Sequence, residues 1–211
     1  CLDNMIKRLL KEYGRGSVCL HGGEPLTLPI DELEYFFSAI RKLGCNPSIQ
    51  TNGTLITDEH IKLFKKYNVH VGLSVDGSPE VYNLRGERKE IVEKVNENLL
   101  KMRRAGVSVG VLCVLHKGNA TGESLEKLCN WVEWLNGLRI GGRFLIMKDF
   151  FGEADEYELT PYELAAAWER LYALLRRRGT ERNWSPFRDF ILSLQGRRRE
   201  ADSFPPPAPM A

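Results

Sequence analysis

The sequence predicts an α/β fold in which short parallel strands alternate with helices. One observation is a series of short apolar runs, which predict strands at Ser17–Leu20, Pro47–Thr51, Val69–Val75, Val107–Leu115 and Arg143–Met147. A second is that every interval between these runs is long enough to hold a helix. A third is the segment Val69–Val75, whose β-branched content is typical of a continuous strand buried on both faces of a parallel sheet. Parallel strands with right-handed crossovers follow from this alternation.

The composition is that of a single globular domain. The chain has 211 residues, of which 43% are hydrophobic and 27% charged, and this length suffices for one sizeable core. A formal net charge of +2 argues against nucleic acid as a partner. No stretch is apolar for long enough to cross a membrane, and the first residues lack the layout of a signal peptide. We therefore expect a cytoplasmic protein without a membrane or nucleic-acid partner.

The helices of the first half are predicted from apolar residues at helical spacing and from residues that start or stop a helix. Helices are expected at Leu2–Tyr13, from Pro29 to Leu43, after an N-cap at Thr57, and around Ile91 to Met102. Gly14, Gly44 and Gly106 follow three of these segments as C-terminal stops. The segment between Asp76 and Arg88 is expected to be a loop.

The second half continues with three more helices. One is predicted around Leu125 to Leu135, and a second begins at the capping box formed by Thr160 and Glu163. The third is expected from Pro186 to Leu194. Residues 197–211 are basic and then rich in proline, which predicts a disordered tail after a core spanning residues 1–196.

The segment His21-Gly22-Gly23-Glu24-Pro25 follows the first predicted strand. Glycine has no Cβ, so it allows positive φ and a close approach to a ligand. The carboxylate of Glu24 can accept hydrogen bonds from an ammonium group, and Pro25 ends the strand because it has no N–H to donate. Taken alone, these residues are compatible with an ordinary turn and with a binding site for a small cation.

Two further strands end in polar residues and glycine. These ends are Ile49-Gln50-Thr51-Asn52-Gly53-Thr54 and Leu73-Ser74-Val75-Asp76-Gly77. In a (β/α) barrel, the carboxyl ends of the strands converge on one mouth. We therefore expect Glu24, Asn52 and Ser74 to cluster at that mouth, with the helices outside.

These three strand ends, taken in order, resemble the radical S-adenosylmethionine (SAM) enzymes. The resemblance covers Val18 to Leu194 and is closest to the branch with anaerobic sulfatase-maturating enzymes and peptide maturases that carry a SPASM domain. It implies a partial (β/α)6 TIM-like barrel that lacks the first strand and the cluster loop. Five of six strands are recognised, and the missing one is expected ahead of Cys1.

The resemblance also implies a cofactor site built on the first two strand ends. The carbonyls and carboxylate of Gly22, Gly23 and Glu24, followed by Pro25, would hold the SAM ammonium group. His21 would face the cofactor, although a hydrogen-bonded histidine at a strand end remains an alternative.

Further contacts with SAM are implied at the second and third strand ends. Thr51 and Asn52 would add neutral polar contacts, although an Asn-Gly turn is common for steric reasons alone. Ser74 and Arg85 would bind the SAM carboxylate, since an arginine can do so through two parallel hydrogen bonds. The alternative for Arg85 is a solvated loop charge. Asp76 is expected to brace its turn.

The cysteines predict no metal site within the sequence. Cys1, Cys19, Cys45, Cys113 and Cys129 lie far apart, and we expect Cys19 and Cys113 to be buried thiols. The enzymes that the chain resembles hold a [4Fe-4S] cluster on three closely spaced cysteines, and those ligands are expected upstream of Cys1. The alternative is that Cys1 is the last of these three cluster-binding cysteines. The SPASM domain is also not seen.

Three functional hypotheses remain open from the sequence. The first is the core of an enzyme that cleaves SAM reductively and uses the 5′-deoxyadenosyl radical to abstract hydrogen from a peptide or protein. Its partners would include an electron donor such as flavodoxin or ferredoxin. The second is a catalytically silent SAM-binding scaffold, and the third is an unrelated barrel enzyme that binds phosphate. The sequence does not identify the substrate.

Overall fold

The computed structural model describes residues 2–14, 16–81, 88–148 and 155–196. Its centre is one sheet of six parallel strands, arranged in the order in which they occur along the chain. The strands are β1 (Ser17–Leu20), β2 (Asn46–Thr51), β3 (His70–Ser74), β4 (Ser108–Leu115), β5 (Gly142–Ile146) and β6 (Trp184–Ser185). Because all strands run in one direction, their carboxyl ends lie along one edge of the sheet.

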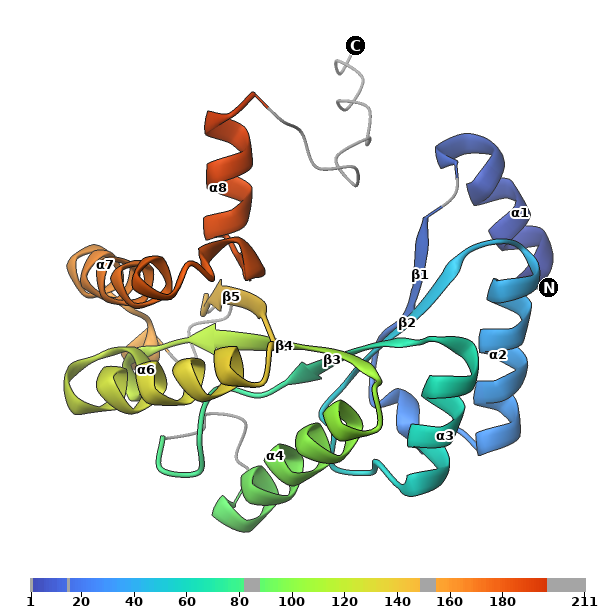
Figure 1. Ribbon diagram of the computed structural model, residues 1–211, viewed down its shortest axis with the longest axis horizontal. Helices are drawn as coiled ribbons and strands as arrows, with labels where there is room; N and C mark the ends of the chain where they lie inside the picture. The colour runs from blue at the N-terminus through green and yellow to red at the C-terminus, as the bar shows by residue number, and fades with distance from the viewer. Residues whose placement is uncertain (1, 15, 82–87, 149–154, 197–211) are drawn as a thin grey trace.

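Helices connect successive strands and cover the outer side of the curved sheet. The α-helices are α1 (Leu2–Tyr13), α2 (Ile30–Lys42), α3 (Asp58–Tyr67), α4 (Lys89–Arg104), α5 (Lys117–Ala120), α6 (Gly122–Gly137), α7 (Pro161–Arg178) and α8 (Phe187–Leu194). Three short 3₁₀ helices are η1 (Pro25–Thr27), η2 (Asp155–Tyr157) and η3 (Glu181–Asn183). Figure 1 shows α2, α3, α4 and α6 along one side of the sheet, with the other side open between α1 and α8. This is the architecture of a partial (β/α) barrel.

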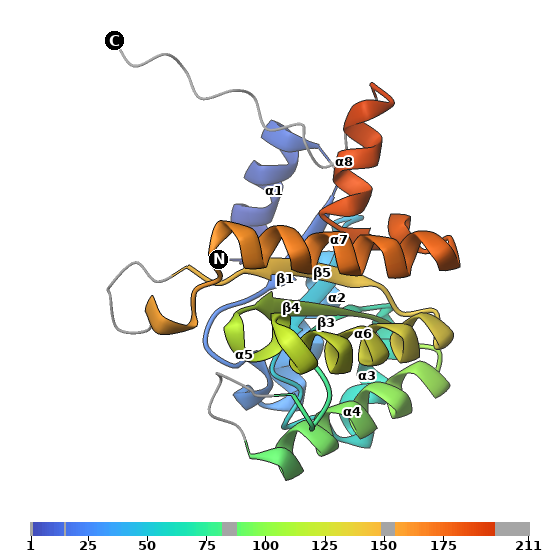
Figure 2. The ribbon, with the colours of Figure 1, turned by 90° about the vertical axis from the view of Figure 1, so that its left-hand side faces the viewer.

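The predicted helix ends are confirmed by their capping contacts. Thr57 caps α3 by accepting a hydrogen bond from the backbone N–H of His60, whose ring completes the capping box. Thr160 and Glu163 form the predicted capping box of α7. Gly179 then ends α7 in the left-handed conformation that glycine adopts at little cost. Figure 2 shows α7 lying across the sheet beside β5.

The two faces of the sheet differ in chemistry. Side chains on the outer face, such as Val71, Leu73 and Phe144, are almost fully buried against the helices. The inner face carries Gln50, His70 and other polar or small residues that line an open cavity. The hydrophobic core therefore lies between sheet and helices, and the inside of the barrel remains accessible to a ligand.

Three features differ from the predictions. The sheet contains a sixth strand, β6, and the short helix α5 precedes α6. A strand of two residues shows no alternation of apolar and polar residues, so its sequence gives no signal. Cys19 is exposed rather than buried, because its register with Ser48 and His70 places it on the open inner face of the edge strand β1. The predicted tail, residues 197–211, lies outside the described residues, as does Cys1.

None of the helices within the described ranges is both long enough and apolar enough to cross a membrane.

Candidate functional site

The candidate site begins at the glycine-rich turn after β1, at the carboxyl edge of the sheet. Gly22 and Gly23 have φ angles of 104° and 54°, which side chains rarely tolerate. Glu24 follows as the N-cap of η1, and Pro25 occupies the first turn of that helix. The turn thus places two bare peptide units beside a carboxylate, as the sequence predicts.

The Glu24 carboxylate joins the ends of β1 and β2. Its Oε1 atom accepts hydrogen bonds from Thr51 Oγ1 at 2.6 Å and from the Leu26 backbone N–H at 3.1 Å. Its Oε2 atom accepts a hydrogen bond from the Asn52 backbone N–H at 2.8 Å. Three donors therefore fix the carboxylate, and the two predicted strand ends are in direct contact.

Thr51 and Asn52 also stabilise the turn that follows β2. Thr51 is only 2% exposed, and its hydroxyl oxygen accepts a hydrogen bond from the Gly53 N–H at 3.1 Å. Asn52 Oδ1 accepts from both the N–H and the hydroxyl of Thr54. These bonds use the Thr51 hydroxyl and the Asn52 amide oxygen, so each residue has a structural role in addition to any contact with a ligand.

Ser74 lies at the end of β3 and is held by a residue of β2. Gln50 Nε2 donates a hydrogen bond of 2.8 Å to Ser74 Oγ. A Cβ atom at Gly72 would lie 2.2 Å from Gln50 Oε1, so glycine is required for Gln50 to cross the inner face. Because Ser74 Oγ accepts from Gln50, its own proton is oriented for donation elsewhere. The role of Gln50 is not apparent in the sequence.

Asp76 was predicted to brace its own turn, and the structure shows that it joins the ends of β3 and β4. It is 4% exposed, and its Oδ1 atom accepts a hydrogen bond of 2.8 Å from the Val114 N–H. Its carbonyl oxygen accepts a hydrogen bond from Asn119 Nδ2, which also bonds to the Val114 carbonyl. The short helix α5, which supplies Asn119, thus closes this part of the barrel edge.

For two predicted site residues, the described structure gives no contact with this cluster. His21 is exposed and has no hydrogen bond within the described part of the chain, which disfavours the alternative of a hydrogen-bonded histidine at the strand end. Arg85 lies outside the described residues, so its contact with a ligand stays a prediction.

The cysteines offer no cluster site among the described residues. Cys45, Cys113 and Cys129 are buried, and burial raises the pKa of the Cys129 thiol to about 11. Within the described ranges, no three histidine, cysteine or acidic side chains gather where they could hold a metal ion. A [4Fe-4S] cluster needs several thiolates, so these residues do not fit one.

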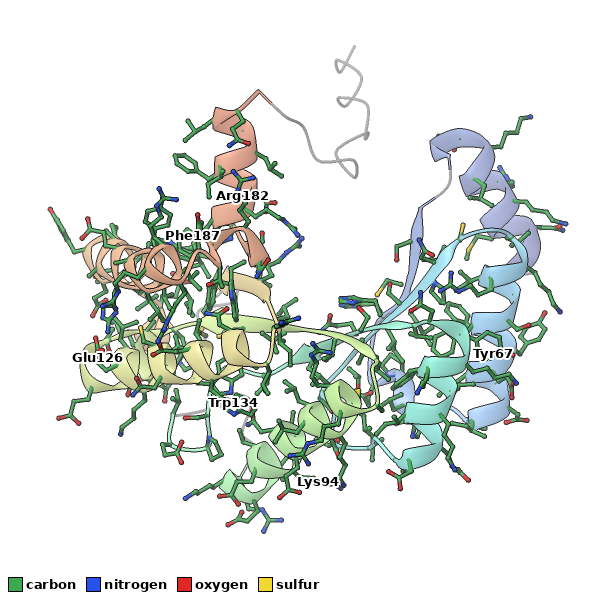
Figure 3. All side chains as sticks on the ribbon, in the orientation of Figure 1. Tyr67, Lys94, Glu126, Trp134, Arg182 and Phe187 are labelled. Atoms are coloured by element: carbon green, nitrogen blue, oxygen red, sulfur yellow. The ribbon has the colours of Figure 1, made fainter. Side chains whose placement is uncertain are left out.

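A cavity of about 710 Å³ lies on the inner face of the sheet, along the amino-terminal halves of β3, β4 and β5 and beside β6. Gln50 lies on its border, and four arginines line it: Arg139, Arg143, Arg182 and Arg188. Figure 3 shows Arg182 beside α8, on the open side of the sheet. Sequence reasoning missed these residues because each is an isolated arginine in a loop, at the start of a strand or in a short helix.

Comparison with known proteins supports the reading of the strand ends. The model of the radical SAM superfamily matches residues 2–132. The cysteine-type anaerobic sulfatase-maturating enzyme of Clostridium novyi is 31% identical over 60% of this chain and 36% of its own length. The serine-type enzyme of Bacteroides thetaiotaomicron is 29% identical over 56% of this chain and 32% of its own length. The chain spans about a third of the length of these curated relatives.

Solved structures agree with this fold. The enzyme anSMEcpe with bound AdoMet and Cp18Cys peptide matches with a TM-score of 0.74 and 24% identity, over 93% of this chain and 58% of that one. Streptococcus suis SuiB bound to its precursor peptide SuiA matches with a TM-score of 0.62 and 19% identity, over 87% and 41%. These likenesses show the architecture of the barrel, and the family match covers the three strand ends. The chain therefore belongs to the radical SAM superfamily.

Proposed function

We propose that this chain is the SAM-binding core of a radical SAM enzyme that modifies a peptide or protein. The observation that carries the proposal is the three-bond tether of Glu24 to Thr51, Asn52 and Leu26, which fixes the glycine turn at the barrel mouth. The family match argues against an unrelated phosphate-binding barrel. The named peptides in the anSMEcpe and SuiB structures support a substrate of the same class.

The residues of the mouth offer suitable groups for the methionine part of SAM. The carbonyls of Gly22 and Gly23 accept no hydrogen bond within the described part of the chain, so they are available to an ammonium group. The Glu24 carboxylate adds negative charge and retains acceptor capacity beyond its three bonds. These groups together would bind and orient the amino end of the cofactor.

The carboxylate of the methionine part requires hydrogen-bond donors. Ser74 meets this requirement, because its hydroxyl accepts from Gln50 and retains a proton to donate to a carboxylate. Arg85 would supply the balancing charge through two parallel hydrogen bonds. Bound SAM, when reduced by one electron, would yield methionine and a 5′-deoxyadenosyl radical that takes a hydrogen atom from the substrate. We propose flavodoxin or ferredoxin as the class of electron donor.

The assignment is tested by calorimetric titration of SAM into the 211-residue chain and two variants. Ser74→Ala and Arg85→Lys should each weaken binding by about 1–3 kcal/mol, because each removes charge-assisted hydrogen bonds and lysine lacks the planar fork. Ser193→Ala is the matched control, since Ser193 is exposed on α8. Equal affinity in all four proteins would refute the proposed roles of Ser74 and Arg85.

A further inference from the structure

Positively charged side chains are concentrated on the inner face of the barrel, and none of them belongs to the residues assigned to the mouth. Arginines line the cavity of about 710 Å³, and no aspartate or glutamate is among its lining residues. The whole chain has a net charge of only +2, with acidic residues on most of its helices. The uneven distribution of charge indicates that this cavity is suited to an anionic ligand.

Three of these arginines have no partner within the described part of the chain. Arg139, Arg143 and Arg182 make no ion pair or side-chain hydrogen bond with any described residue. In contrast, Arg188 lies 3.5 Å from Asp189 Oδ1, so its charge is partly balanced. The three unpaired guanidinium groups are therefore available to a ligand.

The backbone at Arg139 supports a role for its side chain. Arg139 follows α6 with a φ angle of 57°, and hydrogen bonds from Arg139 N to Asn136 O and from Ile140 N to Leu135 O form a Schellman motif. Glycine normally occupies this left-handed position, and Asn68 is the only other described non-glycine residue with positive φ. An arginine here is conformationally unfavourable, and such a residue often marks a functional site.

Arg143 lies near the amino end of β5 but in the same register row as Ser74. In the sheet register, Ser74 pairs with Leu112, Leu112 with Arg143, and Arg143 with Ser185. Two strand spacings separate Ser74 from Arg143, or about 10 Å. A ligand held by Arg143 would thus lie next to a cofactor held by Ser74.

We propose that the inner face binds an acidic segment of the peptide substrate, whose carboxylates pair with Arg139, Arg143 and Arg182. This inference rests on the proposed function, because it assigns the substrate chemistry of the same barrel. Arginine is suited to the task, since its planar fork binds a carboxylate through two hydrogen bonds. His70 borders the same cavity, and desolvation lowers its pKa, which favours the neutral imidazole.

The first test measures fluorescence anisotropy with a pair of labelled peptides. Each has about twelve residues, long enough to span roughly 40 Å when extended, and contains one cysteine among either glutamates or glutamines. The 211-residue chain should bind the glutamate peptide at least about tenfold more tightly at an ionic strength of about 50 mM, and this preference should shrink at about 300 mM. Equal affinity for both peptides would overturn the inference.

Variants localise the binding. Arg143→Gln and Arg182→Gln should each weaken binding of the glutamate peptide about threefold to tenfold, whereas Arg104→Gln, on the outer helix α4, should leave it unchanged. Arg139→Gly should weaken peptide binding and raise the melting temperature, because glycine suits the left-handed position. A purely structural arginine would not produce these opposite effects. Peptide affinity unchanged in all three cavity variants would overturn the inference.

A parallel titration with SAM separates this inference from the proposed function. The cavity variants should keep the SAM affinity of the parent chain, since the cofactor contacts lie at the mouth. Normal SAM binding without preference for the glutamate peptide would overturn only the acidic-substrate inference. Loss of SAM affinity in Arg143→Gln would also overturn it, because the arginine would then serve the cofactor.

Discussion

Replacement of Thr51 by valine tests the tether between the first two strand ends. Valine has nearly the shape of threonine, so the change removes the hydroxyl without opening a cavity. Two hydrogen bonds are lost: the 2.6 Å bond to the Glu24 carboxylate and the 3.1 Å bond from the Gly53 N–H. A bond to a charged group contributes about 1.5–3 kcal/mol and a neutral one about 1 kcal/mol. Because Glu24 is only half-buried, we expect a loss of about 2–3 kcal/mol.

Circular dichroism during urea and thermal unfolding measures this loss. For a chain of this size, the expected loss corresponds to a fall in melting temperature of about 5–10 °C. Thr51→Ser is the matched control, because it keeps the hydroxyl and removes one methyl group, at a cost of about 1 kcal/mol. SAM affinity should also fall in Thr51→Val, since the tether holds the glycine turn. A stability for Thr51→Val equal to that of Thr51→Ser would refute the assigned role of the hydroxyl.

Two further predictions concern stability. Gly53→Ala should destabilise the chain by about 1–3 kcal/mol more than Gly106→Ala, as measured by urea unfolding. Both residues have positive φ, but of the two only Gly53 would place a Cβ against a neighbour, Leu73 Cδ2, at 2.8 Å. Equal losses would contradict the steric argument. Unfolding stability should also fall from pH 9 to pH 11, because the unfolded Cys129 thiol ionises near 9.0 while the folded thiol keeps its proton to about 11. Cys129→Ala should show a shallower pH dependence, and identical profiles would contradict this assignment.

Much of the fold is predictable because each element carries a local signal. The strand Val69–Val75 is recognised by its β-branched residues, and β3 forms within it. The helix at Thr160 is recognised by its capping box, which the structure contains. In contrast, β6 is a strand only because it pairs with β5. A segment of two residues is too short to show a strand pattern in the sequence.

The site is predictable to the extent that the strand direction determines it. Parallel strands bring Glu24, Asn52 and Ser74 to one edge, and the structure confirms that arrangement. The contact of Gln50 with Ser74 depends on the register of β2 against β3 and on the missing side chain of Gly72. Such contacts appear only when the sheet is assembled.

Cys19 illustrates how the position of a strand overrides residue preference. Its apolar neighbours indicate burial, and free cysteine is among the most buried residue types. However, Cys19 is in register with Ser48 and His70 and so lies on the open inner face of the edge strand β1, where the thiol is exposed. The assembled sheet, and not the local sequence, decides which face of this strand is covered.

The most direct test of the account is amide hydrogen exchange of the 211-residue chain with and without SAM. If the cofactor binds at the barrel mouth, exchange should slow in the segments 20–28 and 51–54, whose N–H groups surround the Glu24 tether. Exchange in α4 and α7, which pack on the outside, should not change. Protection confined to the outer helices, or none at saturating SAM, would contradict the assignment of the mouth as the cofactor site.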